Sequence, residues 1–124
     1  MPTMNWAFLC DYAFVGVAGK GYINGTFETL NVENLPAIQP QIFVIFEIAM
    51  AKDENCFITA VINSPTGREL ANDNAICNAP AGGGKIIQPL RFYNTEFSET
   101  GTHRVEIFAD GISVYSLPFT ISIS

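Results

Sequence analysis

The chain has 124 residues and a formal net charge of −6, and its charged share of 15% is well below the roughly 25% of an average globular domain. The six basic residues are scattered, which argues against nucleic acid or an anionic membrane surface as a partner, since both need a concentrated cationic track. This length predicts a single domain, residues 1–124, with a core large enough to fold without disulfides or metals.

Apolar residues make up 48% of the chain. With so few charges, more of the folded surface must be apolar or uncharged than in an ordinary monomer. The composition therefore favours a protein partner, and we expect a homo-oligomer.

Three cysteines, Cys10, Cys56 and Cys77, are widely spaced and accompany a single histidine. A zinc site would need four ligands at recognisable intervals, and a secreted disulfide framework would have an even number of cysteines. We predict buried thiols in a reducing compartment, with no metal and no cofactor. The N-terminus lacks a secretory signal and the longest apolar run, Ile42 to Phe46, is too short to span a bilayer, so we expect a cytoplasmic protein, or a virion protein if its origin is a phage.

Two strands are predicted in the N-terminal part, from Trp6 to Val15 and from Tyr22 to Val32, joined by a glycine-rich turn at 17–21. Asn24-Gly25 falls inside the second strand. It is either the tip of a tighter hairpin or a bulge where the strand bends, and the sequence leaves both readings open.

Asp11 is an acid placed among apolar neighbours in a predicted strand. A buried carboxylate must find a partner. We expect a structural role, in which Asp11 accepts backbone amides from the turn at Gly19 to Gly21 or pairs with Lys20.

A crossover with two prolines at 34–40 leads into an alternating strand from Gln41 to Ala51. Its even positions are all apolar and are predicted to face the core. Phe43 and Ile45 make the opposite face apolar as well at one end. Either the N-terminal strand or another molecule must cover them, so they are interface candidates.

The next strand is predicted from Cys56 to Asn63, followed by a β-turn at 64–67 and a short returning strand from Arg68. The segment Asn72 to Lys85 is rich in asparagine, aspartate and glycine, which predicts a long mobile loop. Ile86 to Phe97 is then a strand that Pro89 makes bulged or places at an edge.

The chain ends in a β-hairpin from Thr100 to Ile123, with Asp110-Gly111 as a type I′ turn that needs two residues at positive φ. The apolar positions change parity beyond Pro118. A bulge at Leu117-Pro118 would reconcile the two halves of the last strand.

No window has the 3.6-residue apolar period of a helix. Seven or eight short strands with turn signals between them predict an all-β fold, a two-sheet antiparallel immunoglobulin-like sandwich.

The run from Glu99 to Val105 resembles the corner before the penultimate strand of immunoglobulin-type sandwiches. In that corner a tyrosine hydroxyl bonds to upstream backbone. His103 occupies the tyrosine's place, so the resemblance implies that His103 makes the same kind of hydrogen bond. Val105 stands where antibody domains have a cysteine, and no inter-sheet disulfide is expected.

Nearly the whole chain resembles a family of small bacterial proteins known only as a domain of unknown function. The stretches that carry the resemblance are Leu9 to Ala13, Gly25 to Leu30, Leu35 to Pro40, and the final hairpin with Asp110-Gly111 and Leu117-Pro118-Phe119. The resemblance implies a sandwich fold and no known activity, and it brings no catalytic residues.

No group of residues carries the pattern of an active site. Gly82-Gly83-Gly84-Lys85 lacks the first glycine and the hydroxyl residue of a phosphate-binding loop. His103 has no nucleophile elbow to serve, and the loop acids match no known calcium loop.

We therefore predict a non-catalytic interaction or assembly module, not an enzyme. Phe43, Ile45 and Phe108 are the candidate contact residues, and Asp11, His103, Asp110, Gly111 and Pro118 are structural. The alternative is a ligand-binding sandwich that holds a sugar or a metal with the loop Asn72 to Lys85 and neighbouring tips.

Overall fold

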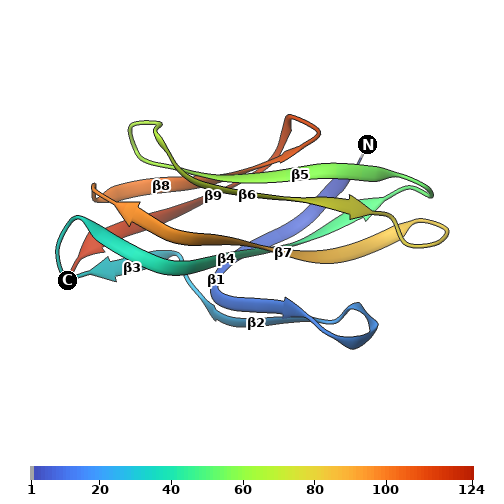
Figure 1. Ribbon diagram of the computed structural model, residues 1–124, viewed down its shortest axis with the longest axis horizontal. Helices are drawn as coiled ribbons and strands as arrows, with labels where there is room; N and C mark the ends of the chain where they lie inside the picture. Colours follow the sequence, from blue (N-terminus) through green and yellow to red (C-terminus); the bar gives the residue numbers. More distant parts are fainter. Residues whose placement is uncertain (1) are drawn as a thin grey trace.

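Nine β-strands and one 3₁₀ turn make up the computed structural model of the protein, which describes residues 2–124 (Figure 1). The all-β prediction is confirmed, with nine strands in place of seven or eight. In chain order the elements are β1 Thr3–Val15, η1 Val17–Gly19, β2 Gly21–Thr26, β3 Thr29–Val32, β4 Ala37–Met50, β5 Asn55–Asn63, β6 Glu69–Asn78, β7 Gly84–Phe97, β8 Gly101–Ala109 and β9 Ile112–Ile123.

The strands form two sheets that pack as a sandwich. The first sheet has the order β2-β1-β4-β7 and the second β3-β9-β8-β5-β6. All pairs are antiparallel except β3 with β9, so the predicted purely antiparallel arrangement is wrong at this one place. Only Phe27 and Glu28 separate β2 from β3, and the chain passes from the first sheet to the second without reversing (Figure 1).

One apolar core fills the space between the sheets. As the alternation predicts, the even positions of β4 from Ile42 to Met50 all point into it, and β5 and β8 supply the opposite wall. Full burial of one large apolar side chain contributes about 1.5–3 kcal/mol, so this layer holds the sheets together. The central members are Ile42, Val44, Phe46, Ile48, Ile58, Ile62, Val105 and Ile107.

The second half of β1 no longer pairs with β4. β1 pairs with β4 from Thr3 to Cys10 and with β2 from Cys10 to Val15. The resulting β1–β2 hairpin packs on the outer face of the sheet, where a second cluster forms from Cys10, Ala13, Phe43 and Ile45. This intramolecular cover, one of the two alternatives left open, explains why β4 is apolar on both faces.

Two glycines allow this hairpin to form. At Gly21 a Cβ would stand 3.1 Å from Cγ2 of Ile87, so glycine favours the close approach of β2 to the sheet. Gly25 has φ +70°, and a Cβ there would meet the carboxylate of Asp11. The β1–β2 register continues without a shift past Asn24-Gly25, so this pair is neither a hairpin tip nor a bulge.

The C-terminal hairpin is confirmed. Asp110 (φ 48°) and Gly111 (φ 85°) both have positive φ, as a type I′ turn requires. The parity change is also real, but the register shift lies between Ser113 and Tyr115 and not at Leu117-Pro118. The bulge therefore stands next to the turn, and it brings Tyr115 opposite Ile107 on the core face.

The predicted mobile loop from Asn72 to Lys85 is wrong. β6 extends to Asn78 and pairs with β5 along its whole length, which leaves only residues 79–83 as a loop. The polar side chains of β6 alternate with half-buried ones, as on any edge strand. Pro89 lies on β7, which is the edge of the first sheet as predicted, in regular register with β4.

The sandwich is closed along the side where β6 and β7 meet. The backbone N–H of Arg91 on β7 donates to Oδ2 of Asp73 on β6 at 2.9 Å, so a side chain joins the two sheets. The opposite side, between β1 and β9, carries no such link among the hydrogen bonds of residues 2–124.

Candidate interaction surface

A chain of ring contacts crosses the outer face of the β1–β2 hairpin and continues onto β4 and β7. Phe14 stacks on Tyr22 with ring centroids 4.6 Å apart and an interplanar angle of 8°. Tyr12 meets Phe14 at 5.8 Å and the edge of Phe43 at 5.2 Å. We name as the aromatic ridge the residues Tyr12, Phe14, Tyr22, Phe43, Arg91 and Tyr93.

Arg91 lies between the rings of Phe43 and Tyr93 and connects them. Its guanidinium carbon lies 4.3 Å from the ring centroid of Tyr93 and 5.6 Å from that of Phe43. Such cation–π contacts contribute about 0.5–1 kcal/mol at exposed sites. These contacts hold the guanidinium of Arg91, the one cation of the aromatic ridge, beside the rings.

The rings are open to solvent although their packing is ordered. Tyr12, Phe14, Tyr22 and Tyr93 are 41–56% exposed, whereas Phe43 is only 5% exposed and forms the floor. Clusters of exposed aromatic side chains with arginine have the composition of protein interfaces, where tyrosine, tryptophan, phenylalanine and arginine are enriched.

The local sequence explains why these rings face outward. In β1 the small Ala13 turns toward Ile45 and is buried, so its neighbours Tyr12 and Phe14 must point away from the sheet. Tyr22 pairs directly with Phe14 across the hairpin and shares this face. The same alternation that builds the small second cluster therefore displays the rings.

β2 also presents an open strand edge beside the rings. It pairs with β1 alone and lies at the end of the first sheet. Its outer row of backbone N–H and C=O groups therefore has no strand partner within residues 2–124. An open edge of this kind can pair with another strand.

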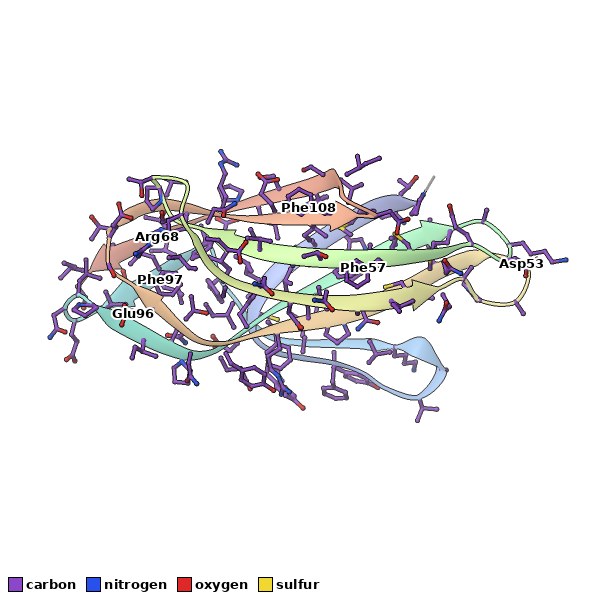
Figure 2. The ribbon with its side chains drawn as sticks, turned by 45° about the horizontal axis from the view of Figure 1, so that its top comes forward. Asp53, Phe57, Arg68, Glu96, Phe97 and Phe108 are labelled. Atoms are coloured by element: carbon purple, nitrogen blue, oxygen red, sulfur yellow. The ribbon has the colours of Figure 1, made fainter. Side chains whose placement is uncertain are left out.

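The predicted interface residues Phe43, Ile45 and Phe108 do not form one exposed surface. Ile45 is fully buried and Phe43 nearly so, because the β1–β2 hairpin covers both, and a partner cannot reach Ile45. Phe108 is half-buried on the outer face of the second sheet, on β8 next to β5, which carries the 46% exposed Phe57 (Figure 2). The exposed rings of the aromatic ridge were not among the predicted residues, although the alternation of aromatic side chains at Tyr12 and Phe14 was a signal for them.

The prediction for Asp11 is wrong. Asp11 is exposed, and its carboxylate lies against Gly25 of β2, in place of the predicted contact with Lys20 or the amides of Gly19 to Gly21. The reason is the direction of the hairpin. In the β1–β2 register Asp11 stands opposite Gly25, whereas the turn at Gly19 lies beyond the end of β1 at Val15.

The remaining predicted residues have structural surroundings. His103 is buried, its Nδ1 lies 3.0 Å from the carbonyl oxygen of Gly101, and its Nε2 has no hydrogen-bond partner. Asp110 and Gly111 form the hairpin turn, and Pro118 lies opposite Arg104 on β9, facing solvent. The bond from His103 to backbone two residues upstream is of the kind that the immunoglobulin corner implies.

The three thiols are free and buried. Burial raises the pKa of Cys10 to about 11, and burial together with the nearby Asp110 raises the pKa of Cys56 to about 11. Cys77, directly opposite Cys56 in the β5–β6 pair, also has a raised pKa because of burial. A buried thiol with a raised pKa is a poor nucleophile.

Among residues 2–124 no cluster of three or more histidine, cysteine, aspartate or glutamate side chains is placed to hold a metal ion. The same part of the chain contains no helix that is long and apolar enough to cross a membrane.

The sequence from residue 5 to residue 122 matches the model of a family of unknown function, DUF6941. The chain belongs to this family. No curated protein sequence matches it.

Solved structures show what the fold is similar to. An immunoglobulin-like protein from Pseudomonas aeruginosa matches with a TM-score of 0.50 and 10% identity, over 98% of this chain and 96% of that one. The fold is therefore immunoglobulin-like.

Parts of larger enzymes are also similar. The alkylpurine DNA glycosylase AlkC of Pseudomonas fluorescens, solved with DNA containing an abasic site analog, gives a TM-score of 0.59 at 11% identity. The β-glucosidase of Listeria innocua, solved with glucose, gives 0.55 at 14%. The matches cover 98% and 77% of this chain but only 30% and 15% of those chains, so they show the sandwich fold alone.

Proposed function

We propose that the chain is a non-catalytic protein-interaction module that forms a homodimer through the aromatic ridge. The observation that carries this proposal is the continuous ring chain from Tyr93 to Tyr22, which is ordered by its own contacts and open to solvent. Burying one large apolar or aromatic side chain contributes about 1.5–3 kcal/mol, so four half-exposed rings provide a substantial driving force for association.

The open edge of β2 supports a second copy as the partner. A two-fold axis perpendicular to β2 places the same patch of both copies against each other and makes their β2 strands antiparallel. Two β2 edges could then pair directly, and the adjoining rings of Tyr22 and Phe14 would meet their counterparts. The aromatic ridge and this edge together form a surface that is complementary to itself.

The charge distribution favours the same face. The chain carries an excess of six negative charges, which opposes contact between most parts of two copies. The only charged member of the aromatic ridge is Arg91, which is held on Phe43 and Tyr93. No negative charge therefore lies within the aromatic ridge itself.

Sedimentation velocity over a wide range of protein concentration tests the proposal. We expect a reversible dimer, and Phe14→Ser should weaken it at least about tenfold, since truncation of a central aromatic anchor commonly costs more than 1 kcal/mol. Phe57→Ser is the matched control, because Phe57 is 46% exposed and Phe14 41%, but Phe57 lies on the second sheet. Circular dichroism would verify that both variants fold.

Three results would overturn the proposal. A strict monomer at the highest concentration would exclude self-association. A dimer weakened by Phe57→Ser and not by Phe14→Ser would move the contact to the second sheet, next to Phe108. Saturable binding of a glycan that Phe14→Ser abolishes, with no dimer, would assign the rings to sugar stacking.

A further inference from the structure

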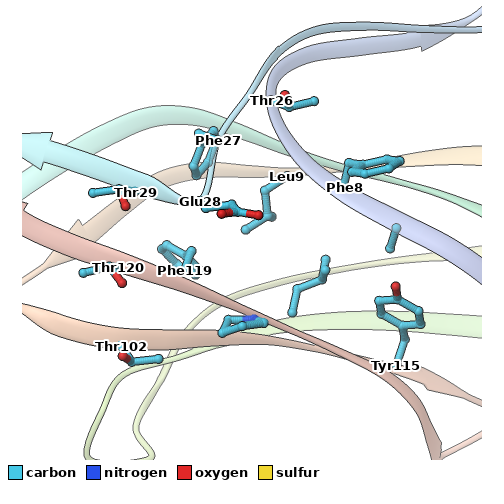
Figure 3. A pocket seen from close by; sticks show the side chains of 13 residues that line it. Phe8, Leu9, Thr26, Phe27, Glu28, Thr29, Thr102, Tyr115, Phe119 and Thr120 are labelled. Carbon is cyan, nitrogen blue, oxygen red and sulfur yellow. The ribbon is translucent and has the colours of Figure 1, made fainter.

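The open side of the sandwich contains a groove between β1 and β9. It has a volume of about 910 Å³ and is lined by both sheets and by the connection from β2 to β3. Figure 3 shows Leu9 and Phe27 on one side of it and Tyr115 and Phe119 of β9 on the other. This groove is separate from the aromatic ridge, with which it shares no residue.

One wall of the groove is an unfinished sheet edge. The backbone N–H of Phe27 donates to the carbonyl oxygen of Leu9 at 3.2 Å, in line with the β1–β2 ladder. Beyond Phe27 the chain crosses to the second sheet as β3, so β1 has no neighbour on this side from Thr3 to Phe8 within residues 2–124. β2 therefore ends here, and no strand within residues 2–124 pairs with β1 at the positions where a longer β2 would continue.

The geometry of β1 identifies the groups that face this position. In an antiparallel strand alternate residues direct both N–H and C=O to the same side. Since Leu9 bonds outward to Phe27, Ala7 also directs its N–H and C=O outward, into the groove. Unpaired backbone groups at an apolar site are satisfied best by another main chain in extended conformation.

The opposite wall lacks one of the donors that strand addition needs. The N–H of Thr120 donates to the carbonyl oxygen of Glu28, so the same alternation makes Pro118 face the groove. Proline has no N–H to offer, which is how edge strands are commonly blunted. An added strand is therefore directed to β1.

The side chains around the groove specify what the added strand carries. Its floor is apolar, with Leu9, Phe27, Leu117 and Phe119, and its rim holds Thr26, Thr29, Thr102 and Thr120. Glu28 is the only carboxylate of the lining, and it lies close to Leu9 in the opening (Figure 3). An extended segment that fits has apolar residues at alternate positions and one lysine or arginine opposite Glu28.

We propose that the groove between β1 and β9 binds an extended, basic-apolar segment of a partner protein, which adds as a strand to Ala7 and its neighbours and continues the line of β2. The proposal does not depend on the homodimer, since the ridge and the groove lie on different parts of the molecule. The Phe14→Ser variant is therefore the form to test, because it separates the two contacts.

Selection of a random peptide library against immobilised Phe14→Ser protein provides the probe. We expect enriched peptides that alternate apolar residues and carry a lysine or arginine. Fluorescence anisotropy with an enriched peptide should show binding that Glu28→Lys weakens about two- to fivefold, the range for a partly exposed ion pair. Glu33→Lys, an equal change of charge at an exposed position after β3, should leave the affinity unchanged.

Two further measurements test the backbone contact. The bound peptide should slow hydrogen exchange of the Ala7 amide, and N-methylation of alternate peptide amides should abolish binding. Failure to enrich any peptide, binding without protection of Ala7, or equal binding of the N-methylated peptide would overturn the proposal. Protection of Ala7 that grows with protein concentration and needs no peptide would also overturn it, because a second copy would then fill the groove.

Discussion

The Oδ1 atom of Asp110 accepts a hydrogen bond from the backbone N–H of Phe57 at 2.9 Å, and the Asp110 N–H donates to the Phe57 carbonyl oxygen at the same distance. One turn residue of the β8–β9 hairpin thus completes the end of β5. Asp110 therefore has two roles. It adopts the positive φ that the type I′ turn needs, and it bonds to the backbone of Phe57.

Substitution of Asp110 separates these two roles. Asp110→Asn keeps an oxygen acceptor and a residue that tolerates positive φ, so it should cost less than about 1 kcal/mol. Asp110→Ala loses both and should cost about 2 kcal/mol, measured as the change in free energy of unfolding in urea. Equal losses for the two variants would show that the bond to Phe57 contributes nothing.

His103 is expected to act mainly by filling space. Its ring packs edge-on against Phe97 at 5.2 Å and lies 5.5 Å from Phe119. His103→Ala leaves a cavity and should lower the free energy of unfolding by about 2–4 kcal/mol. His103→Phe keeps the volume and removes the unpartnered Nε2, so its loss should be less than half as large. Thermal unfolding of both variants measures this, and a larger loss for phenylalanine would show that the bond to Gly101 dominates.

Pro118 is expected to protect the β9 edge from other strands. Pro118→Val restores an N–H that faces the groove between β1 and β9, and it should increase the rate of aggregation at elevated temperature, followed by light scattering. Ser116→Val is the control, because it places the same side chain on the same edge without adding an N–H. If both variants aggregate at the same rate, the apolar side chain and not the edge donor is responsible.

The buried thiols predict a loss of stability at alkaline pH. The pKa of Cys10 and of Cys56 rises from 9.0 to about 11 on folding, mainly because burial disfavours the thiolate. Below pH 9 both states carry the neutral thiol, and between pH 9 and about 11 only the unfolded chain ionises, so the free energy of unfolding falls as pH rises through this window.

Urea unfolding on the two sides of this window measures the effect. The double variant Cys10→Ala/Cys56→Ala should lose less stability than the natural chain between about pH 8 and about pH 10, because the two proteins differ only in these thiols. In the folded natural chain the thiols should also resist a thiol reagent near neutral pH. Equal alkaline losses, or rapid modification of the native protein, would contradict the assignment.

Local sequence patterns predicted those elements whose structure depends on neighbouring residues alone. The alternation from Ile42 to Met50 and the Asp110-Gly111 turn were sufficient because period-two burial and positive φ are properties of neighbouring residues. The start of β6 was predicted, but its extension from Asn72 to Asn78 was missed because its asparagines are turn formers by composition, whereas here pairing with β5 overrides that preference.

The candidate surfaces were only partly visible in the sequence. Phe43 and Ile45 were recognised as needing cover, but the sequence could not tell whether the cover came from the chain itself. The β1–β2 hairpin supplies it, and so the exposed rings are those on its other face, Tyr12, Phe14 and Tyr22.

By itself the sequence determined an all-β sandwich, the face of β4 that enters the core and the turn that closes the last hairpin, since these depend on side chains a few residues apart. Only the tertiary structure decided where β1 stops pairing with β4, what covers the second apolar face of β4, and which backbone groups remain unpaired at Ala7. Those features depend on contacts between strands distant in sequence, and no local pattern encodes them.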